Sequence, residues 1–513
     1  MSERLTIPHL ALASAHRWPT AEAVVDGARR LSFADLAAQM EEAAAAFVAA
    51  GLQPGDRVGL WLPNGLDWIV ACLGLHAAGG ILVPLNTRYK AEEARYILAR
   101  AGVRMVVAAD DFLGVRYGEL TAGLGVPSLE RVVTAGVGGN WPDFISAAGV
   151  PARAEVRNRI DALTEDSVSD IMFTSGTTGN PKGAVTTHGQ TIRTAQQWGR
   201  ATTLAAGDRF LILWPLFHTS GYKGAWIPSL SVGATVLPMA TLDMPLLLDI
   251  VERERVTFLP GPPPLFQTLL AMPDRKPGML ESLRVSVTGG TSVAPSMIEA
   301  MRRELGIPIV LTGYGLTETC GTATMTGPGD PPEIVAVSCG RAIEGVELAC
   351  VDDDNRPVPV GQPGEVVIRG MNVMRGYLDD PEATAQAIDA DGWLHSGDIG
   401  VLDAAGYLRI TDRKKDMFIV GGYNCYPAEI EKMLLAHPAI LQVAVAGVPD
   451  ERMGEVGKAY VVRKQDHVLE AEELIAWSRE RMANFKVPRH VAFVPELPTN
   501  ATGKVQKFRL AEL

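Results

Sequence analysis

Cysteine is scarce in this chain and forms no recognisable pattern. The 513 residues contain only five cysteines, with no C-x-x-C pair and no metal-site spacing. An odd, sparse set in a chain of this length is typical of reduced thiols. The composition therefore argues against a disulfide scaffold or a zinc module, and we expect a cytoplasmic protein. The cysteines are Cys72, Cys320, Cys339, Cys350 and Cys425.

Positive charge is also in short supply. Lys and Arg number 47 against 59 Asp and Glu, which gives a formal net charge of −12. No long run of Lys or Arg occurs, and broad nucleic-acid binding needs a basic face. We therefore expect no nucleic-acid partner, and any anionic ligand must be held by local groups.

Long apolar runs are missing, apart from one stretch. Residues 68–85 (WIVACLGLHAAGGILVPL) carry no formal charge and are long enough for a membrane span. However, His76, the Gly79-Gly80 pair and Pro84 interrupt the run, which predicts a short helix, a turn and a buried strand. The first residues also lack the basic region and cleavage site of a signal peptide. We expect neither a membrane span nor a signal peptide.

Short β-rich runs alternate with helical patterns through the first four hundred residues. The clearest helix, 33–50, follows Ser32 and carries Asp35 near its start, which favours a helix N-terminus. This alternation predicts an α/β fold with parallel and mixed sheets and flanking helices. Between Gly345 and Tyr377 the spacing predicts a small β element. The predicted strands are 57–62, 104–108, 257–260 and 284–288.

A compact unit of about a hundred residues follows the charged segment 412–416, the usual size of a small domain. Pro427 lies in the first turn of a predicted helix, followed by strands at 441–448 and 459–463 and a helix at 472–482. We predict a large N-terminal domain, 1–414, and a small mobile α+β domain, 415–513.

The segment 173–185 (FTSGTTGNPKGAV) is the most informative in the chain. Its glycines allow backbone N–H groups to converge on an anion, its hydroxyls supply further donors, and Lys182 adds a cation. Pro181 stands where a Walker A loop needs glycine, and the Gly313-x-Gly315 pattern lacks the third glycine of a dinucleotide fingerprint. The segment is either a phosphate-binding loop of another kind or an ordinary Ser/Gly turn.

The segment resembles the signature loop of the adenylate-forming superfamily, which includes acyl-CoA synthetases, adenylation domains and luciferases. Further motifs of that superfamily follow in the same order, so that the resemblance runs from about residue 30 to the C-terminus. It implies an enzyme that activates a carboxylic acid with ATP. The further motifs are Gly289–Thr291, 313–318 (GYGLTE), 392–398 (GWLHSGD), 412–416 (DRKKD) and 498–504 (PTNATGK).

The resemblance implies a site for ATP. Tyr314 could stack on a purine, Glu318 could hold Mg²⁺ together with Thr177, and Asp398 could bind ribose hydroxyls. Each also has a purely structural interpretation, as a core aromatic, a helix-terminal carboxylate and a turn aspartate. Arg413 completes the site by resemblance. The expected nucleotide-binding residues are Thr174, Ser175, Gly176, Thr177, Thr178, Gly179, Lys182, Gly289, Gly290, Thr291, Gly313, Tyr314, Gly315, Thr317, Asp398 and Arg413.

The resemblance also implies a mobile catalytic lysine, Lys504, which otherwise would be an ordinary surface lysine. A cation there would offset the repulsion between the acid carboxylate and the α-phosphate. Lys415 matches the family's hinge position, about which the small domain rotates before coenzyme A attacks. The expected catalytic residues are Lys504, Glu318, Thr177 and His218, and those of the coenzyme A tunnel are Gly421, Gly422 and Tyr423.

The residues 214–218 (WPLFH) bear on the substrate. Amino-acid-activating relatives carry Asp where this chain has His218, and a buried ammonium without a carboxylate partner would be costly. We therefore do not expect an amino-acid substrate. His218 fits the gate-like histidine of acyl- and aryl-CoA ligases, or is a satisfied core histidine. The chain ends nine residues after Lys504, which favours free coenzyme A over a fused carrier domain.

Four segments together resemble those of ligases that activate the propionate side chains of degraded steroid rings. They are 83–89 (VPLNTRY), 218–225 (HTSGYKGA), 310–318 (VLTGYGLTE) and 372–398. Small residues at three pocket positions suit a wide, rigid acid. We hypothesise that Lys223 meets an oxygen at the far end of that acid, whereas the alternative is a surface lysine. The expected acyl-pocket residues are Trp214, His218, Tyr222, Lys223, Gly313, Gly315 and Gly321.

We predict an ATP-dependent acyl-CoA ligase that forms an acyl-AMP and then a thioester on a bulky polycyclic acid derived from a steroid or a terpenoid, with Mg²⁺ as cofactor. Its expected partners are the carboxylic acid, ATP and coenzyme A, and a homodimer is compatible with the sequence. The alternatives are a fatty-acid or aryl-acid ligase, an acyl-AMP ligase that loads a carrier protein, and a catalytically silent scaffold.

Overall fold

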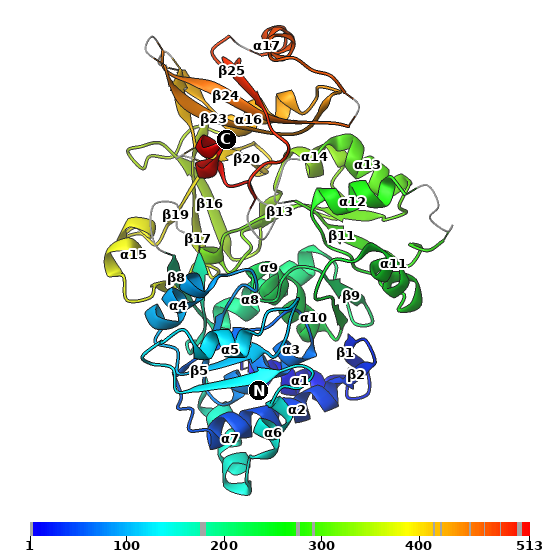
Figure 1. Ribbon diagram of the computed structural model, residues 1–513, viewed down its shortest axis with the longest axis vertical. Coiled ribbons are helices and arrows are strands. Elements are labelled where there is room, and N and C mark those ends of the chain that lie inside the picture. Colours follow the sequence, from blue (N-terminus) through cyan, green and yellow to red (C-terminus); the bar gives the residue numbers. More distant parts are fainter. Residues whose placement is uncertain are drawn as a thin grey trace.

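The structure is a computed structural model. It describes residues 4–174, 181–272, 278–289, 293–413, 416–420, 423–450, 453–465, 467–482, 484–499 and 505–513. The N-terminal half occupies the lower part of the molecule and the last hundred residues its upper end (Figure 1).

A seven-stranded mixed sheet lies in the lower part, in the order β18-β8-β7-β4-β3-β5-β6. Its strands from β7 to β6 run parallel and are joined by crossover helices. At one edge, β8 runs antiparallel to β7, and β18 runs antiparallel to β8. The predicted α/β fold class is confirmed. The strands are β3 (Arg57–Trp61), β4 (Ile81–Pro84), β5 (Met105–Ala109), β6 (Arg131–Ala135), β7 (Val168–Thr174), β8 (Lys182–Thr187) and β18 (Gly376–Tyr377), and the helices include α4 (Ala91–Arg100), α5 (Tyr117–Ala122), α6 (Trp141–Ser146), α7 (Val150–Ala162) and α8 (His188–Ala201).

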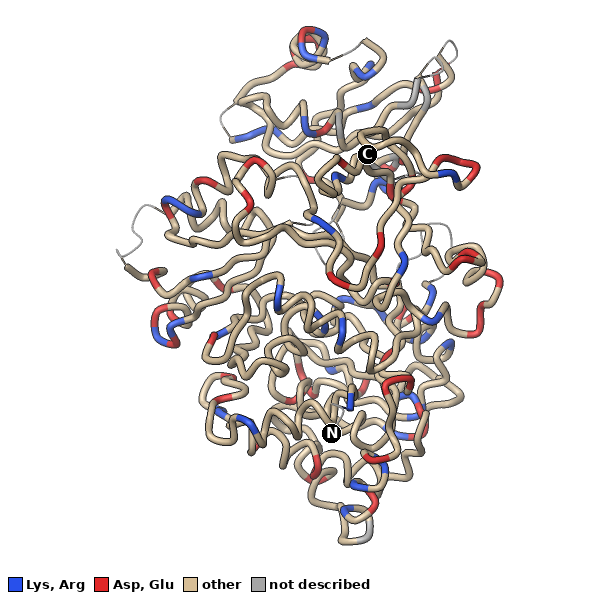
Figure 2. The backbone as a smooth tube through the Cα atoms, turned by 180° about the vertical axis from the view of Figure 1, so that it is seen from behind, with Lys and Arg blue, Asp and Glu red and all other residues tan. Residues whose placement is uncertain are grey.

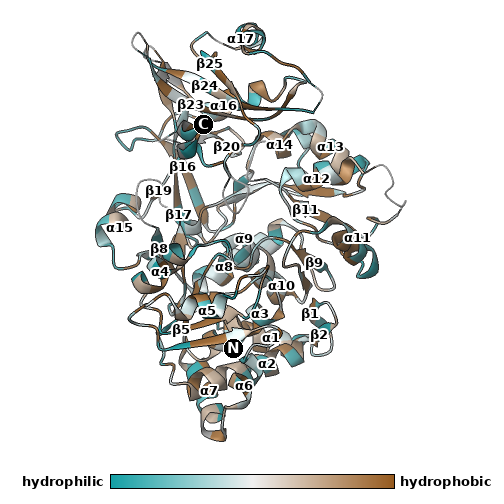
Figure 3. Ribbon diagram, in the orientation of Figure 1, coloured by the Kyte–Doolittle hydropathy of each residue, from teal (hydrophilic) through white to brown (hydrophobic). Residues whose placement is uncertain are grey.

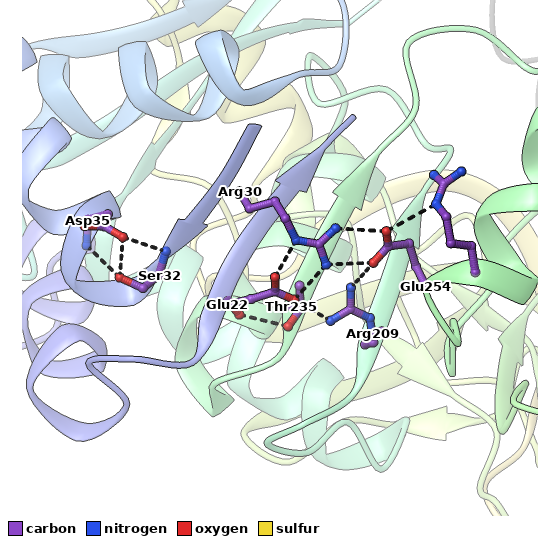
Figure 4. Close-up of polar contacts among 8 residues, drawn as sticks. Glu22, Arg30, Ser32, Asp35, Arg209, Thr235 and Glu254 are labelled. Atoms are coloured by element: carbon purple, nitrogen blue, oxygen red, sulfur yellow. Dashed lines mark hydrogen bonds and ion pairs between the residues drawn. The ribbon is translucent and has the colours of Figure 1, made fainter. Parts of the chain in front are cut away.

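The apolar stretch 68–85 divides as its interruptions predict. It contributes most of the buried helix α3 (Leu66–Ala77), a turn and the strand β4. The neighbouring helix α2 (Phe33–Ala49) begins after Ser32, whose hydroxyl and backbone are hydrogen-bonded to Asp35 in a capping box (Figure 4). Within the described residues, no helix is both long enough and apolar enough to cross a membrane.

A second sheet, of order β2-β1-β10-β9, packs beside the first and continues towards β11 and β12. The predicted strand 257–260 is instead a single bridging residue, Phe258, between Phe210 and Val285. Backbone hydrogen bonds continue on the β11 side, from Leu259 to Val285 and from Gly261 to Val287, whereas Pro260 has no N–H to donate on the β9 side. The elements are β1 (Glu22–Asp26), β2 (Arg29–Ser32), β9 (Arg209–Ile212), β10 (Thr235–Pro238), β11 (Val285–Val287), β12 (Ile309–Leu311), α1 (Ile7–Arg17), α9 (Thr219–Gly221), a π-helix (Tyr222–Trp226), α10 (Ile227–Val232), α11 (Met244–Arg253), α12 (Pro263–Leu270), α13 (Pro295–Arg303) and α14 (Pro332–Val337).

An ion-pair network ties the β1–β2 hairpin to β9 and the end of α11 (Figure 4). Glu22 accepts hydrogen bonds from Arg30 and Arg209 at 2.6 and 2.8 Å, and Glu254 accepts from the same two guanidinium groups. The hydrogen bonds from Arg30 are the largest influence that lowers the pKa of Glu254, to about 2. Elsewhere positive and negative residues are intermixed along the visible chain (Figure 2).

The predicted small β element is an antiparallel sheet of order β16-β17-β19-β20, next to a three-stranded sheet β13-β14-β15. It brings the segment around Asp398 beside β13. The elements are β13 (Gly313–Tyr314), a 3-10 helix (Thr317–Thr319), β14 (Thr324–Met325), β15 (Arg341–Ala342), β16 (Val346–Val351), β17 (Pro363–Gly370), α15 (Pro381–Ala387), β19 (Leu394–Leu402) and β20 (Leu408–Arg413).

The last hundred residues form a sheet of order β22-β21-β24-β23, with β25 parallel to β24. Two clusters of buried hydrophobic residues consist entirely of residues from Phe418 onward, and hydrophobic residues run along these strands (Figure 3). The elements are β21 (Phe418–Val420), β22 (Tyr423–Cys425), α16 (Pro427–Leu434), β23 (Ile440–Asp450), β24 (Gly454–Arg463), α17 (Ala471–Arg479), β25 (His490–Phe493) and a 3-10 helix (Lys507–Glu512).

Candidate active site

The glycine-rich segment leaves one central strand and returns on the next. β7 ends at Thr174 and β8 begins at Lys182, and these two residues are register partners in the antiparallel ladder. The hydroxyl of Thr174 also donates to the carbonyl of Lys182 at 3.4 Å. Both ends of the predicted phosphate loop are therefore held together by the sheet. Ser175, Gly176, Thr177, Thr178 and Gly179 lie outside the described residues.

Glu318 is connected to the same pair of strands by Tyr377, which lies in β18 next to β8. The hydroxyl of Tyr377 donates to Oε1 of Glu318 at 2.9 Å, and Nζ of Lys182 lies 5.2 Å from the centroid of the Tyr377 ring. Burial and then the carboxylate of Glu318 raise the pKa of Tyr377, so the phenol stays protonated and donates. A cation, an aromatic ring and a carboxylate thus form a chain from the loop to Glu318. Thr317 lies in the same 3-10 helix.

Tyr314 and Asp398 meet although 84 residues separate them. The Tyr314 hydroxyl donates to Oδ2 of Asp398 at 2.7 Å. Burial, followed by the Asp398 carboxylate, raises the pKa of Tyr314 well above its usual value. Arg413 is the register partner of Asp398 across β19 and β20, which brings three predicted nucleotide residues together. The side chain of Arg413 lies outside the described part.

Gly289 follows β11 with φ of +147°, a backbone conformation that favours glycine. The prediction of a small-residue strand end is compatible with this position. Gly290 and Thr291 lie outside the described residues.

His218 caps the short helix α9. Its Nδ1 accepts a hydrogen bond from the backbone N–H of Ser220 at 3.3 Å and lies 2.9 Å from the Ser220 hydroxyl. Burial lowers the pKa of His218, so the ring is neutral near pH 7. Because Nδ1 is the acceptor, the ring proton is on Nε2, where it can be donated to an anionic partner. Trp214, four residues earlier, is half-buried.

The hypothesis for Lys223 needs correction. Its side chain is 1% exposed, so it is not a surface lysine, and its ammonium already donates to Asp170 at 2.8 Å and Thr186 at 2.7 Å. Tyr222, another expected pocket residue, is fully buried, and its hydroxyl lies 3.1 Å from Nε2 of His76. Both side chains are engaged inside the protein, which leaves no support for a contact of Lys223 with the far end of an acid.

The small size of Gly313, Gly315 and Gly321 does not support the expected wide pocket. A Cβ on Gly321 would lie 2.8 Å from Cβ of Thr219, and one on Gly315 would lie 2.5 Å from the backbone nitrogen of Thr322. A Cβ on Gly313 would lie 2.8 Å from the carbonyl oxygen of Thr324. These glycines are small because protein atoms approach them closely, so they do not indicate a wide pocket.

Two models of known protein families match the chain. The model described as "AMP-binding enzyme" matches residues 12–378, more than half of the chain, and "AMP-binding enzyme C-terminal domain" matches residues 429–504.

The chain belongs to the AMP-binding enzyme family.

Curated relatives of this AMP-binding enzyme are coenzyme A ligases. A 3-[(3aS,4S,7aS)-7a-methyl-1,5-dioxo-octahydro-1H-inden-4-yl]propanoyl:CoA ligase from Rhodococcus jostii (strain RHA1) is 46% identical over 99% of this chain and 98% of its own length. The protein of the same name from Mycobacterium tuberculosis (strain ATCC 25618 / H37Rv) is 47% identical over 99% of both. A feruloyl-CoA synthase from Amycolatopsis sp is 36% identical over 95% of both. The prediction of an acid–thiol ligase is confirmed.

Solved structures agree with the fold. ATP-bound MatB from Rhodopseudomonas palustris has a TM-score of 0.89 and 28% identity, covering 99% of this chain and 98% of its own. A fatty acyl CoA synthetase from Mycobacterium tuberculosis has a TM-score of 0.77 and 30% identity, again over 99% and 98%.

Two residues at the site of this AMP-binding enzyme, Tyr377 and Asp170, were not predicted from the sequence. Nothing in the sequence marks Tyr377 as the partner of Glu318. Asp170 did offer a signal, because it is the only charged residue in the strand Val168–Thr174. Besides the loop residues 175–179, Gly290 and Thr291, four further predicted residues fall outside the described part of the chain, namely Lys504, Lys415, Gly421 and Gly422. Tyr423 is described only as part of strand β22.

Proposed function

We propose that this enzyme activates a polycyclic carboxylic acid with a propanoate side chain, of the methyl-dioxo-octahydroindenyl class. The observation that carries the proposal is the 46–47% identity to two ligases named for that acid, over 99% of the chain. The feruloyl-CoA synthase is 36% identical, and the fatty acyl CoA synthetase 30%. Aryl and fatty acids therefore have weaker support.

The proposed reaction has two steps. A carboxylate oxygen attacks the α-phosphorus of ATP, pyrophosphate leaves, and an acyl-AMP forms. The thiolate of coenzyme A then attacks the acyl carbon, AMP leaves with the bonding electron pair, and a thioester forms. The mixed anhydride provides the activated acyl group for the second step.

We assign the nucleotide to the surface between the glycine-rich loop and the Tyr314–Asp398 pair. The hydrogen bond between Tyr314 and Asp398 supports this assignment, because it places an aromatic ring beside a carboxylate that can accept ribose hydroxyls. Lys182, at the start of β8, would add a cation near the phosphates. Arg413 and the loop residues 175–179 keep the roles that the family resemblance implies.

We propose that Glu318 and Thr177 hold Mg²⁺. Oε1 of Glu318 accepts one hydrogen bond from Tyr377, which leaves carboxylate lone pairs for a hard cation. Among the described residues no group of three or more metal-ligating side chains occurs. One carboxylate, Glu318, and one hydroxyl, Thr177, fit Mg²⁺, which is usually held by one or two carboxylates together with substrate phosphates and water. Mg²⁺ would neutralise phosphate charge in the transition state.

We propose that Nε2–H of His218 donates a hydrogen bond to the carboxylate of the acid. Its lowered pKa and the Nδ1 contact with Ser220 support a neutral ring with this proton on Nε2. Lys504 would stabilise the charge that builds up at the α-phosphate, and withdrawing it would end the adenylation step.

We further propose that the domain boundary lies between residues 414 and 415, with Lys415 as the hinge and Gly421, Gly422 and Tyr423 beside the pantetheine of coenzyme A. The separate hydrophobic clusters that begin at Phe418 support an independent C-terminal unit. A cytoplasmic location is proposed because all five cysteines are free thiols. A homodimer stays a prediction, which light scattering would test.

Mass spectrometry of products tests the substrate proposal. The enzyme would be given ATP, Mg²⁺, coenzyme A and pooled acids of three kinds, namely polycyclic propanoates, straight-chain fatty acids and cinnamate-type acids. We expect the polycyclic acyl-CoA as the main thioester. A fatty or aryl thioester in its place would overturn the substrate, and an acyl-AMP without thioester would overturn coenzyme A as the acceptor.

A further inference from the structure

A buried ion pair joins the phosphate-loop strands to the segment that follows His218. Nζ of Lys223 lies 2.8 Å from Oδ1 of Asp170 and donates to Oγ1 of Thr186 at 2.7 Å. The Thr186 hydroxyl in turn donates to Oδ1, and the Ser169 hydroxyl donates to Oδ2, each at 2.7 Å. The Lys223 and Asp170 side chains are 1% and 0% exposed. One carboxylate therefore receives donors from β7, β8 and the π-helix.

The position of this pair in the chain links it to both halves of the site. Asp170 lies four residues before Thr174, the last residue of β7, and Thr186 lies four residues after Lys182, the first residue of β8. Asp170 and Thr186 are also register partners in the ladder. Lys223 lies five residues after His218. The ion pair thus connects the base of the phosphate-loop hairpin to the helical segment that carries His218.

The local helix geometry is unusual at the same place. Residues Tyr222–Trp226 form a π-helix, closed by the N–H of Ile227 bonding to the carbonyl of Tyr222. Such turns contain an extra residue and are frequent at functional sites. The Tyr222 ring stacks on Trp226 at 5.8 Å, and both rings meet Trp68 edge-on. Aromatic packing holds this wide turn, and Lys223 ties it to the sheet.

Stability alone does not account for such a pair. Taking two charges out of water is costly, and well-packed apolar residues of the same volume are often equally stable or more so. Apolar contacts, however, have no preferred direction, whereas a buried ammonium group must stay within hydrogen-bonding distance of both of its acceptors. The property that an apolar pair could not supply is the register between helix and hairpin.

We propose that Lys223 is a positioning residue for adenylation. Through Asp170 and Thr186 it holds the His218 segment in register with the phosphate loop, so that the acid carboxylate faces the α-phosphate. This inference rests on the proposed function. After the acyl-AMP bond has formed, the two groups are joined covalently and no longer need this alignment. Lys223 therefore acts in the first half-reaction and not in the second.

The test compares the two half-reactions in a Lys223→Met variant, which keeps an unbranched side chain one atom shorter and removes the charge. ATP–pyrophosphate exchange reports the first step, and thioester formation from supplied acyl-adenylate reports the second. We expect the kcat of exchange to fall by about 100-fold, the effect of a displacement of about 1 Å at reacting groups. The KM for ATP and the second step should stay within about twofold of the wild-type values.

A double variant, Lys223→Met with Asp170→Leu, separates positioning from stability. It removes both charges, so we expect its unfolding midpoint to recover towards wild type while exchange stays low. Thr186→Val is a milder change that keeps the ion pair, and we expect about a fivefold loss of exchange. Thr191→Val is the matched control, because its hydroxyl lies 3.4 Å from Asp170 but comes from α8, outside the loop strands.

Three results would overturn the proposal: full exchange activity in Lys223→Met, recovery of exchange together with stability in the double variant, or equal losses in both half-reactions. If neither Lys223 variant folds, wild-type exchange in Thr186→Val would also overturn it. All rates are measured with whichever acid the wild type adenylates best. A wild-type enzyme that ignores polycyclic acids therefore counts against the proposed substrate and leaves this test intact.

Discussion

Replacing Tyr377 by Phe tests whether the chain from Lys182 to Glu318 serves catalysis. The change removes only the hydroxyl that donates to Glu318 at 2.9 Å. The aromatic face beneath the Lys182 ammonium remains, so that the cation–π contact persists. Any loss can therefore be attributed to the hydrogen bond to the carboxylate.

The expected size of this loss follows from the contact. Hydrogen bonds to charged groups contribute about 1.5–3 kcal/mol. Tyr377 and Glu318 are both half-buried, so water can partly replace the lost donor, and the lower end of that range applies. About 1.5 kcal/mol corresponds to roughly a tenfold lower rate of ATP–pyrophosphate exchange. A less well oriented Glu318 should also raise the Mg²⁺ concentration that gives half-maximal exchange.

The chain contains a matched control. The hydroxyl of Tyr407 donates to Asp330 at 2.6 Å, and the guanidinium of Arg341 lies 4.8 Å from its ring. Tyr407→Phe thus removes the same kind of hydrogen bond and keeps the same kind of cation contact, at residues that belong to no predicted site. It should leave exchange unchanged. Wild-type exchange in Tyr377→Phe, or equal losses in both variants, would refute the reasoning.

Three further predictions concern stability and catalysis. Burial lowers the pKa of His76 to about 4 and that of His188 well below 6.5. As the pH falls, these histidines therefore bind protons in the unfolded chain and not in the folded protein. Each histidine should reduce the unfolding free energy by about 1.4 kcal/mol between pH 7.5 and 5.5, as measured in urea titrations. An unfolding free energy that does not change over this range would contradict the assignment. Gly315→Ala would force a Cβ against backbone atoms, and it should destabilise the enzyme by about 1–3 kcal/mol and abolish exchange, whereas Gly329→Ala, with open space around its Cβ, should do neither. Lys504→Ala should lower adenylation by about 100-fold or more while ATP binding, measured by calorimetry, persists; wild-type adenylation would exclude Lys504 as the catalytic cation.

The parts of the fold that depend on local pattern could be predicted from the sequence. The interruptions at His76 and Pro84 divide the apolar stretch into α3 and β4, and Ser32 with Asp35 marks the start of α2. These features depend on backbone conformation within a few residues. The strand predicted at 257–260 is reduced to one bridging residue, Phe258, because Pro260 offers no N–H towards β9.

The partner of Glu318 could not be predicted. Tyr377 lies 59 residues away from Glu318 in the sequence. Their contact depends on the pairing of β18 with β8, and no residue type indicates that pairing. The role of Gly315 could not be predicted from the sequence either, because a small residue fits an open pocket and a close backbone contact equally well.

The case of Lys223 shows how a lysine in an apolar segment should be interpreted. Lysine is almost never fully buried unless it is paired, so a lysine in the segment YKGAWIP requires either solvent or a carboxylate. The lone aspartate in VSDIMFT requires a donor for the same reason. Two opposite charges, each in an otherwise apolar element, could therefore have been paired before any substrate was considered. Because the pair joins the elements that bear the phosphate loop and His218, its consequence is to be sought in the alignment of the two reacting groups, and not in the recognition of the acid.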